Sequence, residues 1–230
     1  MVSQETIEAI SAFTTCDVAD ALQKFQVPQG GFLSGLTMWS PERQNGSTRI
    51  VGPAYTVKYV LNEDDDKSKP SEHYVDTIPS GSVVFISAPP DIVNAVYGGL
   101  MATRAQYSGA VGTIVDGRIR DLQEHRDLNY PVFAREVGTS APAEVVRVSA
   151  INVPVALRSP GQQTTVNPGD ILVADLNGVV CIPAHLADQL PELMESQAAA
   201  DEKIAEEIKK GAKFAEASKK HRGGVRMPRT

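Results

Sequence analysis

The chain has 230 residues, of which 42% are hydrophobic and 22% are charged; this ordinary globular composition excludes extensive disorder and a coiled coil. Its formal net charge of −6 at pH 7 excludes a general nucleic-acid-binding surface, because phosphate binding requires concentrated Lys and Arg. Neither a membrane span of roughly 18 continuous apolar residues nor a signal-peptide pattern is present, so we expect one cytoplasmic domain over residues 1–230, with no nucleic-acid or membrane partner.

Residues 1–27 predict two short helices with a break near Thr15, since apolar residues recur at helical spacing on either side of it. Thr14, Thr15 and Asp17 are candidate caps of the second helix, because each can accept a hydrogen bond from a free amide at a helix start. A loop rich in Gly, Pro and Ser is expected over residues 28–45.

Strands and helices alternate through the middle of the chain. Short or alternating apolar runs predict strands over residues 49–61, 80–89, 111–117 and 130–136. Helices are predicted over residues 91–108 and 121–128, with Gly109 as the C-cap glycine of the first. This order favours a parallel sheet with right-handed crossovers. The acidic segment 62–73 is expected to be a surface loop.

The last part of the chain has two different patterns. Residues 144–157 and 164–183 are strand-rich with Gly, Asn and Pro breaks, which predicts an antiparallel hairpin portion and two packed sheets rather than one doubly wound sheet. Residues 184–214 predict a C-terminal helix that ends at Gly211, and its many charges indicate that it projects and packs on one side only. The basic remainder, residues 215–230, is expected to be a flexible tail.

A cluster of charged side chains follows the strand VGTIVDG, at the carboxyl end where parallel α/β proteins collect their ligands. Its members are Asp116, Arg118, Arg120 and Asp121. Arg120 suits a substrate carboxylate, because a guanidinium donates two parallel hydrogen bonds, and Asp121 suits a hard divalent cation. Glu124 follows on the same helix face and is a candidate base or partner of a metal-bound water.

A purely structural interpretation of these residues is also open. Asp121 could cap the short helix, with Glu124 as its capping-box partner. Asp116 and Arg118 could pair with one another at the rim of a site, and Asp175 in VADLNGV is typical of a turn.

Two glycines open the predicted helix in YGGLM. Gly98 and Gly99 would let the backbone approach a ligand, leaving the Leu100 and Met101 amides as donors at the helix start. Turn formation or close packing would explain the glycines equally well.

Other site chemistries lack their signatures. The sequence contains no GxSxG, GxxxxGK[ST], HExxH or GxGxxG motif. Cys16 and Cys181 match no zinc spacing, and we expect both to be buried and reduced. His125 is expected to be exposed on a charged helix and is given no role. A site built from an arginine and a metal therefore remains.

Three segments carry a resemblance to a known family: the early TTCDVADAL, then YGGLMATRAQYSGAVGTIVDGRIRDLQEHRDLNYPVFARE, and later NPGDILVADLNGVVCIP. They resemble the RraA-like family, which includes the class II 4-hydroxy-4-methyl-2-oxoglutarate/4-carboxy-4-hydroxy-2-oxoadipate aldolases. The resemblance covers nearly the whole chain. It implies an α/β fold of the β/β/α type, like the phosphohistidine swivelling domain, with packed sheets, flanking helices and a projecting C-terminal helix. It also implies a trimer or a pair of trimers, with active sites between subunits.

The resemblance assigns roles to individual residues. Asp121 corresponds to the Mg²⁺ or Mn²⁺ ligand of the family. Arg120 corresponds to the residue that holds the pyruvyl carboxylate and steadies the enolate, and the amides of Leu100 and Met101, after Gly98, would bind the same carboxylate.

One position departs from the family pattern. The bacterial aldolases have an acidic residue where this chain has Gly99, and we infer that Glu124 supplies the missing carboxylate. A further ligand of the metal-bound water would come from the late helix of a neighbouring subunit, where Glu202 matches best and Glu206 second.

The activity that the resemblance implies is metal-dependent cleavage of 4-hydroxy-2-oxo acids to pyruvate. Arg120 and the cation would stabilise the enolate, so no lysine Schiff base is required. Water activated by carboxylates would remove the C4 hydroxyl proton, whereas oxaloacetate decarboxylation would need no such base. The alternative is a non-catalytic protein that regulates an RNA-processing enzyme, since an acidic surface suits a basic partner.

Overall fold

The computed structural model describes residues 2–65, 67–157, 159 and 161–222. At its centre lie four parallel strands whose side chains are mostly buried, as expected where both faces of a sheet are covered. They are β3 (Ile50–Leu61), β4 (Val83–Ser87), β6 (Gly112–Ile119) and β7 (Val132–Val137). The short β5 (Ala95–Tyr97) also pairs with β6 in parallel.

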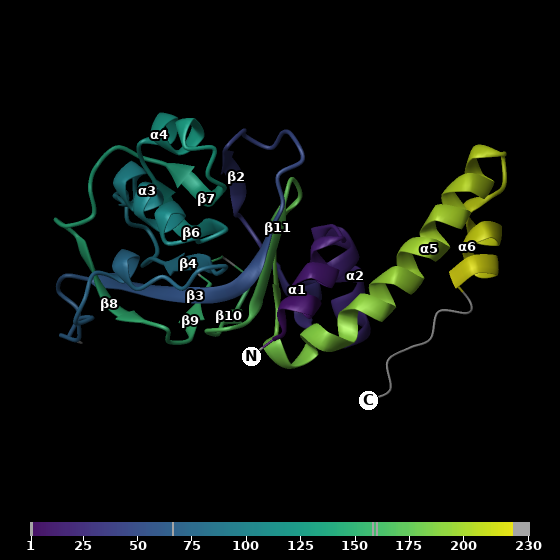
Figure 1. Cartoon of the computed structure of the whole chain (residues 1–230), viewed down its shortest axis with the longest axis horizontal. Helices are drawn as coiled ribbons and strands as arrows, with labels where there is room; N and C mark the ends of the chain where they lie inside the picture. The colour runs from purple at the N-terminus through teal and green to yellow at the C-terminus, as the bar shows by residue number, and fades with distance from the viewer. Residues whose placement is uncertain (1, 66, 158, 160, 223–230) are drawn as a thin grey trace.

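Antiparallel strands extend this parallel set at both ends (Figure 1). They are β1 (Phe32–Leu33), β2 (Thr37–Ser40), β8 (Val146–Ile151), β11 (Ile171–Asp175) and β12 (Gly178–Ile182). The resulting order is β1-β12-β11-β3-β4-β6-β7-β2, with β8 paired to β3. The predicted hairpin portion is thus confirmed in β11 and β12, while β9 (Val155–Ala156) and β10 (Thr165–Val166) form a separate two-stranded sheet.

The long strand β3 belongs to both portions of the sheet. Residues 50–53 pair with β11, residues 54–58 with β4, and residues 57–61 with β8. Pro53, which has no backbone N–H to donate, is the last residue of β3 that pairs with β11. The two packed sheets that were predicted are therefore joined into one hydrogen-bonded sheet, which is continuous through β3.

The two portions of this sheet nevertheless pack on one another. Phe85 of β4 and Ile114 of β6 share a buried apolar cluster with Leu172 of β11 and Val179 of β12. Burial of such side chains is the main favourable contribution to folding, so this shared cluster holds the parallel and antiparallel portions together.

Helices cover the outer face of each portion of the sheet, on the side away from the shared apolar cluster. The helix α3 (Gly99–Tyr107) packs through Ala102 and Ala105 on the parallel portion, next to α4 (Leu122–Asp127). The predicted helix over residues 91–108 was wrong in its first half, because residues 95–97 pair with β6 as a strand and Gly98 forms the N-cap. Gly109, at φ 82°, does end the helix as predicted.

The N-terminal helices α1 (Gln4–Ser11) and α2 (Thr15–Lys24) pack on the antiparallel portion. Thr14 caps α2 in a capping box with Asp17, which confirms the first of the three candidate caps. Cys16 was expected to be buried but is exposed, since α2 buries Thr15 and Val18 on its opposite face, while Cys181 is buried. A 3₁₀ turn, η1 (Pro28–Gly31), follows.

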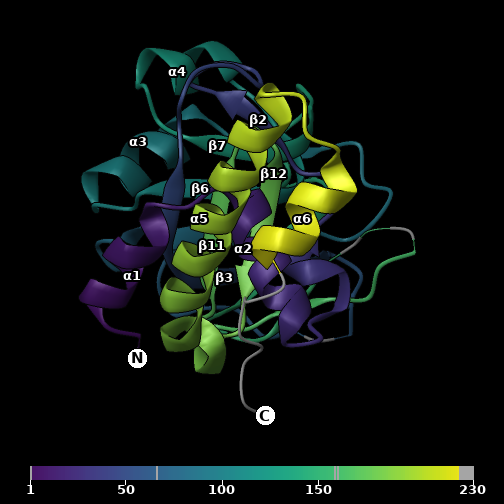
Figure 2. The ribbon, with the colours of Figure 1, turned by 90° about the vertical axis from the view of Figure 1, so that its right-hand side faces the viewer.

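After β12, the 3₁₀ segment η3 (Ala184–Gln189) leads into α5 (Leu190–Lys209), which projects from the body (Figure 1). Gly211, at φ 94°, ends this helix, and α6 (Phe214–Arg222) turns back beside it (Figure 2). The flexible tail predicted from residue 215 was therefore wrong as far as Arg222. Residues 223–230 lie outside the described residues.

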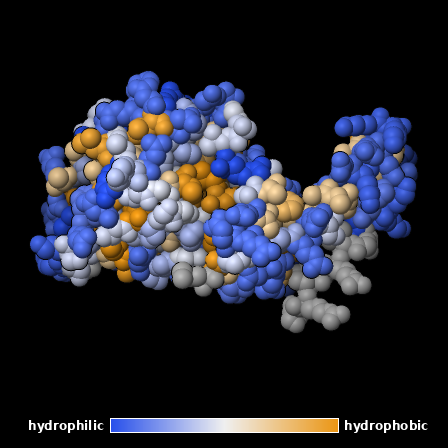
Figure 3. Space-filling view, viewed as in Figure 1, coloured by the Kyte–Doolittle hydropathy of each residue, from blue (hydrophilic) through white to orange (hydrophobic). Residues whose placement is uncertain are grey.

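Ion pairs explain why α6 is held against α5. Glu207 contacts Lys220 at 2.6 Å and His221 at 2.9 Å, and Arg222 contacts Asp201 at 2.7 Å. The visible surface of this arm is largely hydrophilic (Figure 3). Within the described part of the chain, no helix combines the length and the apolar character needed to cross a membrane.

The loops also follow the sequence pattern. The acidic segment 62–73 is almost entirely exposed wherever it is described, which confirms the predicted surface loop. It leads into the 3₁₀ turn η2 (Tyr74–Asp76), whose Tyr74 side chain is buried.

Candidate active site at the start of helix α3

The predicted site residues come together where β5 and β6 end. Gly98 follows β5, and Arg120 with Asp121 follows β6. The Arg120 backbone N–H donates to the carbonyl of Tyr97 at 2.9 Å, which ties the two strand ends to one another. The parallel pairing of β5 with β6 therefore brings YGGLM to RIRDLQE, although the two segments are separate in the sequence.

Asp121 has a left-handed backbone conformation, φ 58° and ψ 41°, and its carbonyl accepts the Glu124 amide at 2.9 Å. Its side chain makes no capping hydrogen bond to α4. The carboxylate instead accepts the backbone N–H of Gly99 at 3.1 Å and lies 3.4 Å from Nε of Arg120. The capping-box interpretation of Asp121 and Glu124 is thus wrong, because the carboxylate points to a different helix.

The two glycines are required by the close approach of both carboxylates. A Cβ on Gly98 would lie 2.6 Å from Oδ2 of Asp121. A Cβ on Gly99 would lie 2.6 Å from Cδ of Glu124 and closer still to its Oε2. Neither glycine has a positive φ, so space rather than backbone conformation explains them. Asp121 and Glu124 thus flank the first turn of α3.

The amides of this first turn are only partly available to a ligand. The Gly99 N–H is used by Asp121, and the Met101 N–H donates to the Gly98 carbonyl at 3.1 Å. Among the described residues, no acceptor contacts the Leu100 N–H, and its side chain is 76% exposed. Of the two amides predicted to bind a carboxylate, the Leu100 amide is therefore the one that no acceptor in the described ranges already occupies.

The site is open to solvent and contains both signs of charge. The side chains of Arg120 and Asp121 are 40% and 33% exposed, so a small molecule can reach both. Carboxylate oxygens are the ligands that Mg²⁺ and Mn²⁺ prefer, and Mg²⁺ keeps several waters. Within the described residues, no three His, Cys, Asp or Glu side chains gather around one point, so one chain offers at most the Asp121 and Glu124 carboxylates here.

His125 lies beneath the site and was expected to be exposed. It is fully buried and stacks on Tyr97, with ring centroids 5.7 Å apart and planes 11° apart. Neither ring nitrogen has a hydrogen-bond partner among the described residues. Burial lowers the pKa of His125, and the nearby Arg120 backbone and Asp121 charge only partly oppose this. The signal that could have predicted it is its spacing from Leu122, which places both on the inner face of α4.

Two predicted residues lie elsewhere. Asp116 and Arg118 project from β6 on the opposite face from α3, together with Ile114. They do not pair with one another as was suggested; Asp116 pairs with Arg135 and Arg118 with Glu136, each at 2.5 Å.

The late-helix carboxylates are also remote within one chain. Glu202 and Glu206 lie exposed on α5, far along the projecting arm from α3 and α4 (Figure 1).

Asp175 is a turn residue, as predicted, but it does more. It accepts the Asn177 N–H at 2.9 Å within the β11–β12 turn. It also accepts the N–H of Thr15 at 2.9 Å and its hydroxyl at 2.6 Å, at the start of α2. Burial alone would raise the pKa of Asp175, but these hydrogen bonds outweigh it and lower the pKa.

Known proteins are similar to this chain in sequence and in fold. Protein DlpA of Legionella pneumophila is 31% identical over 207 residues, which are 88% of this chain and 31% of DlpA, so the chain spans about a third of that relative. A protein of Halalkalibacterium halodurans, named as a candidate 4-hydroxy-4-methyl-2-oxoglutarate aldolase, is 30% identical over 87% of this chain and 89% of its own length.

The fold is also shared. A crystal structure of an uncharacterised protein from Pseudomonas syringae pv. tomato superposes with a TM-score of 0.82, at 27% identity, over 95% of both chains. The sequence model of the RraA-like family, described as Aldolase/RraA, matches residues 15–181, and these include the whole site around Arg120 and Asp121. The chain therefore belongs to the RraA-like family.

Proposed function

We propose that this protein is a divalent-metal-dependent class II pyruvate aldolase that cleaves 4-hydroxy-4-methyl-2-oxoglutarate-type substrates to pyruvate and also decarboxylates oxaloacetate. The observation that carries the proposal is the convergence of the Arg120 guanidinium, the Asp121 carboxylate and the Glu124 carboxylate on the first turn of α3. Family membership and the names of relatives support it. We further propose that the fold is of the swivelling β/β/α type and that the protein is cytoplasmic.

Arg120 is the residue that binds and orients the substrate in this proposal. Its guanidinium is held beside Asp121 but remains 40% exposed, so it can donate parallel hydrogen bonds to the carboxylate of a 2-oxo acid. The Leu100 amide, at the positive end of α3, is a second donor for the same carboxylate. Both groups stabilise the negative charge that develops on the pyruvyl fragment when the carbon–carbon bond breaks.

Asp121 is the residue that would hold Mg²⁺ or Mn²⁺, with water as the remaining ligands, and the cation would add Lewis-acid stabilisation of negative charge. Glu124 would accept a proton through a bound water. Its carboxylate occupies the space that a side chain at residue 99 would otherwise fill. Oxaloacetate decarboxylation requires no base, so it depends on Arg120 and Asp121 but not on Glu124.

A homo-oligomer, either a trimer or a hexamer, is part of the proposal. The arm carries Glu202 and Glu206 away from their own site, so these side chains are available to the site of a neighbouring subunit. Glu202 is the first candidate to complete that site and Glu206 the second.

The test is a pyruvate-coupled assay with oxaloacetate and several 4-hydroxy-2-oxo acids, with and without a chelator. Arg120→Ala and Asp121→Ala should each lower pyruvate formation by about 10²-fold or more, the effect of removing one group that stabilises developing charge. Asp127→Ala, at the exposed end of the same helix α4, is the matched control and should retain the rate. Unchanged rates in the Arg120 and Asp121 variants would refute the enzymatic function.

A second candidate function, binding to an RNA-processing enzyme without catalysis, is favoured by the net charge of −6, which suits a basic partner. It predicts no pyruvate from any of these substrates and retention of partner binding in Asp121→Ala. The same assay therefore separates the two.

A further inference from the structure

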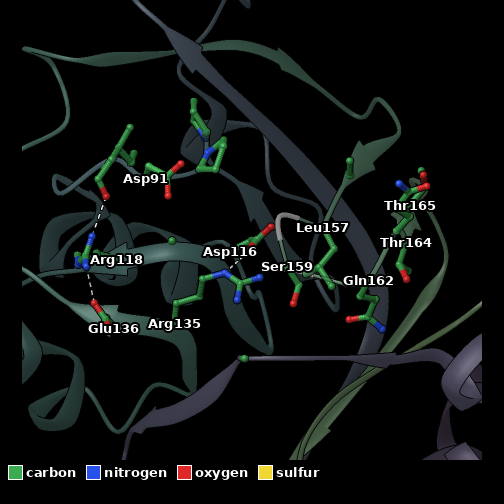
Figure 4. A pocket seen from close by; sticks show the side chains of 17 residues that line it. Asp91, Asp116, Arg118, Arg135, Glu136, Leu157, Ser159, Gln162, Thr164 and Thr165 are labelled. Atoms are coloured by element: carbon green, nitrogen blue, oxygen red, sulfur yellow. Dashed lines mark hydrogen bonds and ion pairs between the residues drawn. The ribbon is translucent and has the colours of Figure 1, made fainter.

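A pocket of about 1120 Å³, drawn in Figure 4, is lined by residues on the face of the parallel strands opposite to α3. Asp116 and Arg118 reach it from β6 and Arg135 reaches it from β7, on the side of the strands that carries Ile114 and Phe133. The candidate active site lies on the helix-covered side, so the two sites share strand β6 but not a face. No residue of the pocket has a role in the proposed aldolase reaction.

Arg135 is the central feature of this pocket. Its Nε donates to the fully buried carboxylate of Asp116 at 2.5 Å, and the Arg135 side chain is itself only 23% exposed. A Cβ on Gly35 would collide with its Nη1, so the glycine makes room for the guanidinium. Its Nη2 is buried and has no hydrogen-bond partner among the described residues.

A buried cationic donor without a partner is costly, and in a pocket it indicates an acceptor that a ligand supplies. Because the donor is charged, an anionic oxygen is a better partner than a neutral one. Arg118 does not compete for that oxygen, since it already donates to the Ile92 carbonyl at 2.7 Å and to Glu136 at 2.5 Å (Figure 4). Arg135 is thus the anion-binding group of the pocket.

The remaining charges limit which anion can bind. The described lining includes the cations Arg118 and Arg135 and the anions Asp91, Asp116 and Glu136, which sum to 2 − 3 = −1. The described charges therefore give no excess of cations for a dianion such as phosphate, because like charges repel. A ligand that brings a carboxylate is better matched to the described lining if it also brings a positive charge.

Asp91 is placed to receive that positive charge. It lines the pocket on the wall across from Arg135 (Figure 4). Its residue is exposed, and no ion pair or hydrogen bond to its side chain is found within the described residues. Its backbone has φ 65°, a conformation that non-glycine residues rarely adopt and that recurs at functional sites.

From these contacts we infer that the pocket binds a small zwitterion, an amino acid or ω-amino acid, whose carboxylate meets Nη2 of Arg135 and whose ammonium meets Asp91. The distance between Nη2 of Arg135 and the Asp91 carboxylate would then determine how far apart the carboxylate and the ammonium of the ligand must be. The apolar side chains of Ile92 and Leu157, which also line the pocket, suit the methylene groups between them.

The experiment is a titration of the full chain, by calorimetry or ligand-observed NMR, with glycine, β-alanine, γ-aminobutyrate and δ-aminovalerate. One of the series should bind saturably. It should bind about tenfold or more tightly than the matched carboxylic acid without the amine and the matched amine without the carboxylate, since each loses one charge-assisted contact. Equal binding of the carboxylic acid, or of inorganic phosphate, would overturn the assignment, as would no saturable binding by any member.

Two variants make the test specific. Asp91→Asn keeps a residue that tolerates a positive φ, and it should weaken zwitterion binding by about tenfold or more, while the carboxylic acid, relieved of one like charge, should bind no more weakly than before. Asp127→Asn, at an exposed position of α4, is the matched control and should bind as the unmodified chain does. Arg135→Lys should weaken the binding of both the zwitterion and the carboxylic acid, but it also alters the ion pair with buried Asp116. Asp91→Asn is therefore the deciding variant. Unchanged zwitterion binding in Asp91→Asn would refute the proposal.

Discussion

The carboxylate of Glu124 lies directly against Cα of Gly99, where a Cβ would be 2.8 Å from the Glu124 Cβ and closer to its carboxylate. The backbone conformation of residue 99 does not require glycine. Glycine is needed there because the Glu124 side chain leaves no room for a Cβ. The two positions are therefore coupled: either a side chain occupies residue 99 or the Glu124 carboxylate occupies that space.

This coupling predicts a non-additive pair of substitutions. Gly99→Ala should lower the free energy of unfolding by about 1–3 kcal/mol, the usual cost of forcing extra atoms into a packed contact. Adding Glu124→Ala should restore part of that loss, because it removes the colliding carboxylate but keeps the Glu124 Cβ, 2.8 Å from the new Cβ. Urea unfolding of the two single variants and the double variant measures the coupling, and strictly additive effects would show that the helices adjust without strain.

Replacing Arg120 by lysine tests whether geometry or charge matters. Arg120→Lys keeps the positive charge but cannot donate two parallel hydrogen bonds to a carboxylate. We expect kcat/KM for oxaloacetate to fall by about tenfold or more, because one charge-assisted hydrogen bond contributes about 1.5–3 kcal/mol. Arg126→Lys, whose arginine contacts the Trp39 carbonyl instead, is the control. Full activity in Arg120→Lys would mean that charge alone suffices.

Asp175 predicts an acid-dependent loss of stability. Because its pKa is lower in the folded state, its contribution is present above the unfolded pKa of about 3.9 and is lost as pH falls through the folded value. Asp175→Ala should lower stability at pH 7 by about 1–3 kcal/mol, since it leaves the Thr15 donors unpaired. Thermal unfolding from pH 7 to 3 should show the difference shrinking; a constant difference would contradict the role of the charge.

His125 predicts a separate change at milder pH. Its pKa is lowered by burial, so the folded state favours the neutral ring while the unfolded chain takes up a proton below about pH 6.5. Stability should therefore decrease as pH falls from about 7 toward 5, and His125→Phe should flatten this decrease. His185→Phe, at an exposed position of η3, is the control. If both variants follow the unmodified protein, His125 does not set this dependence.

The strands of the parallel portion could be predicted from the sequence because runs such as VVFI in β4 are apolar throughout, which is typical of a doubly covered strand or a buried helix. The segment before α3 could not. Val96 fits a helical apolar stripe with Ile92 and Leu100, and its assignment to β5 depends on pairing with β6, a contact between segments that local spacing does not encode.

The candidate site, like the fold, could be predicted from the sequence only in part. Arg120, Asp121 and Glu124 are recognisable by their spacing, and the structure places them around the first turn of α3. The direction of the Asp121 carboxylate was open, because a capping box and a contact with Gly99 require the same residue types. The structure resolves it through the left-handed backbone of Asp121, which turns the side chain away from its own helix.

Strand β3 also limits how this protein can change its length. Because residues 50–53 and 54–58 of one strand serve different neighbours, an insertion or deletion near Pro53 would exchange inward and outward side chains in one portion relative to the other. The exposed segment 62–73, directly after the strand, carries no such constraint. Natural variation in length should therefore accumulate in that loop, and grafts or tags are best placed there.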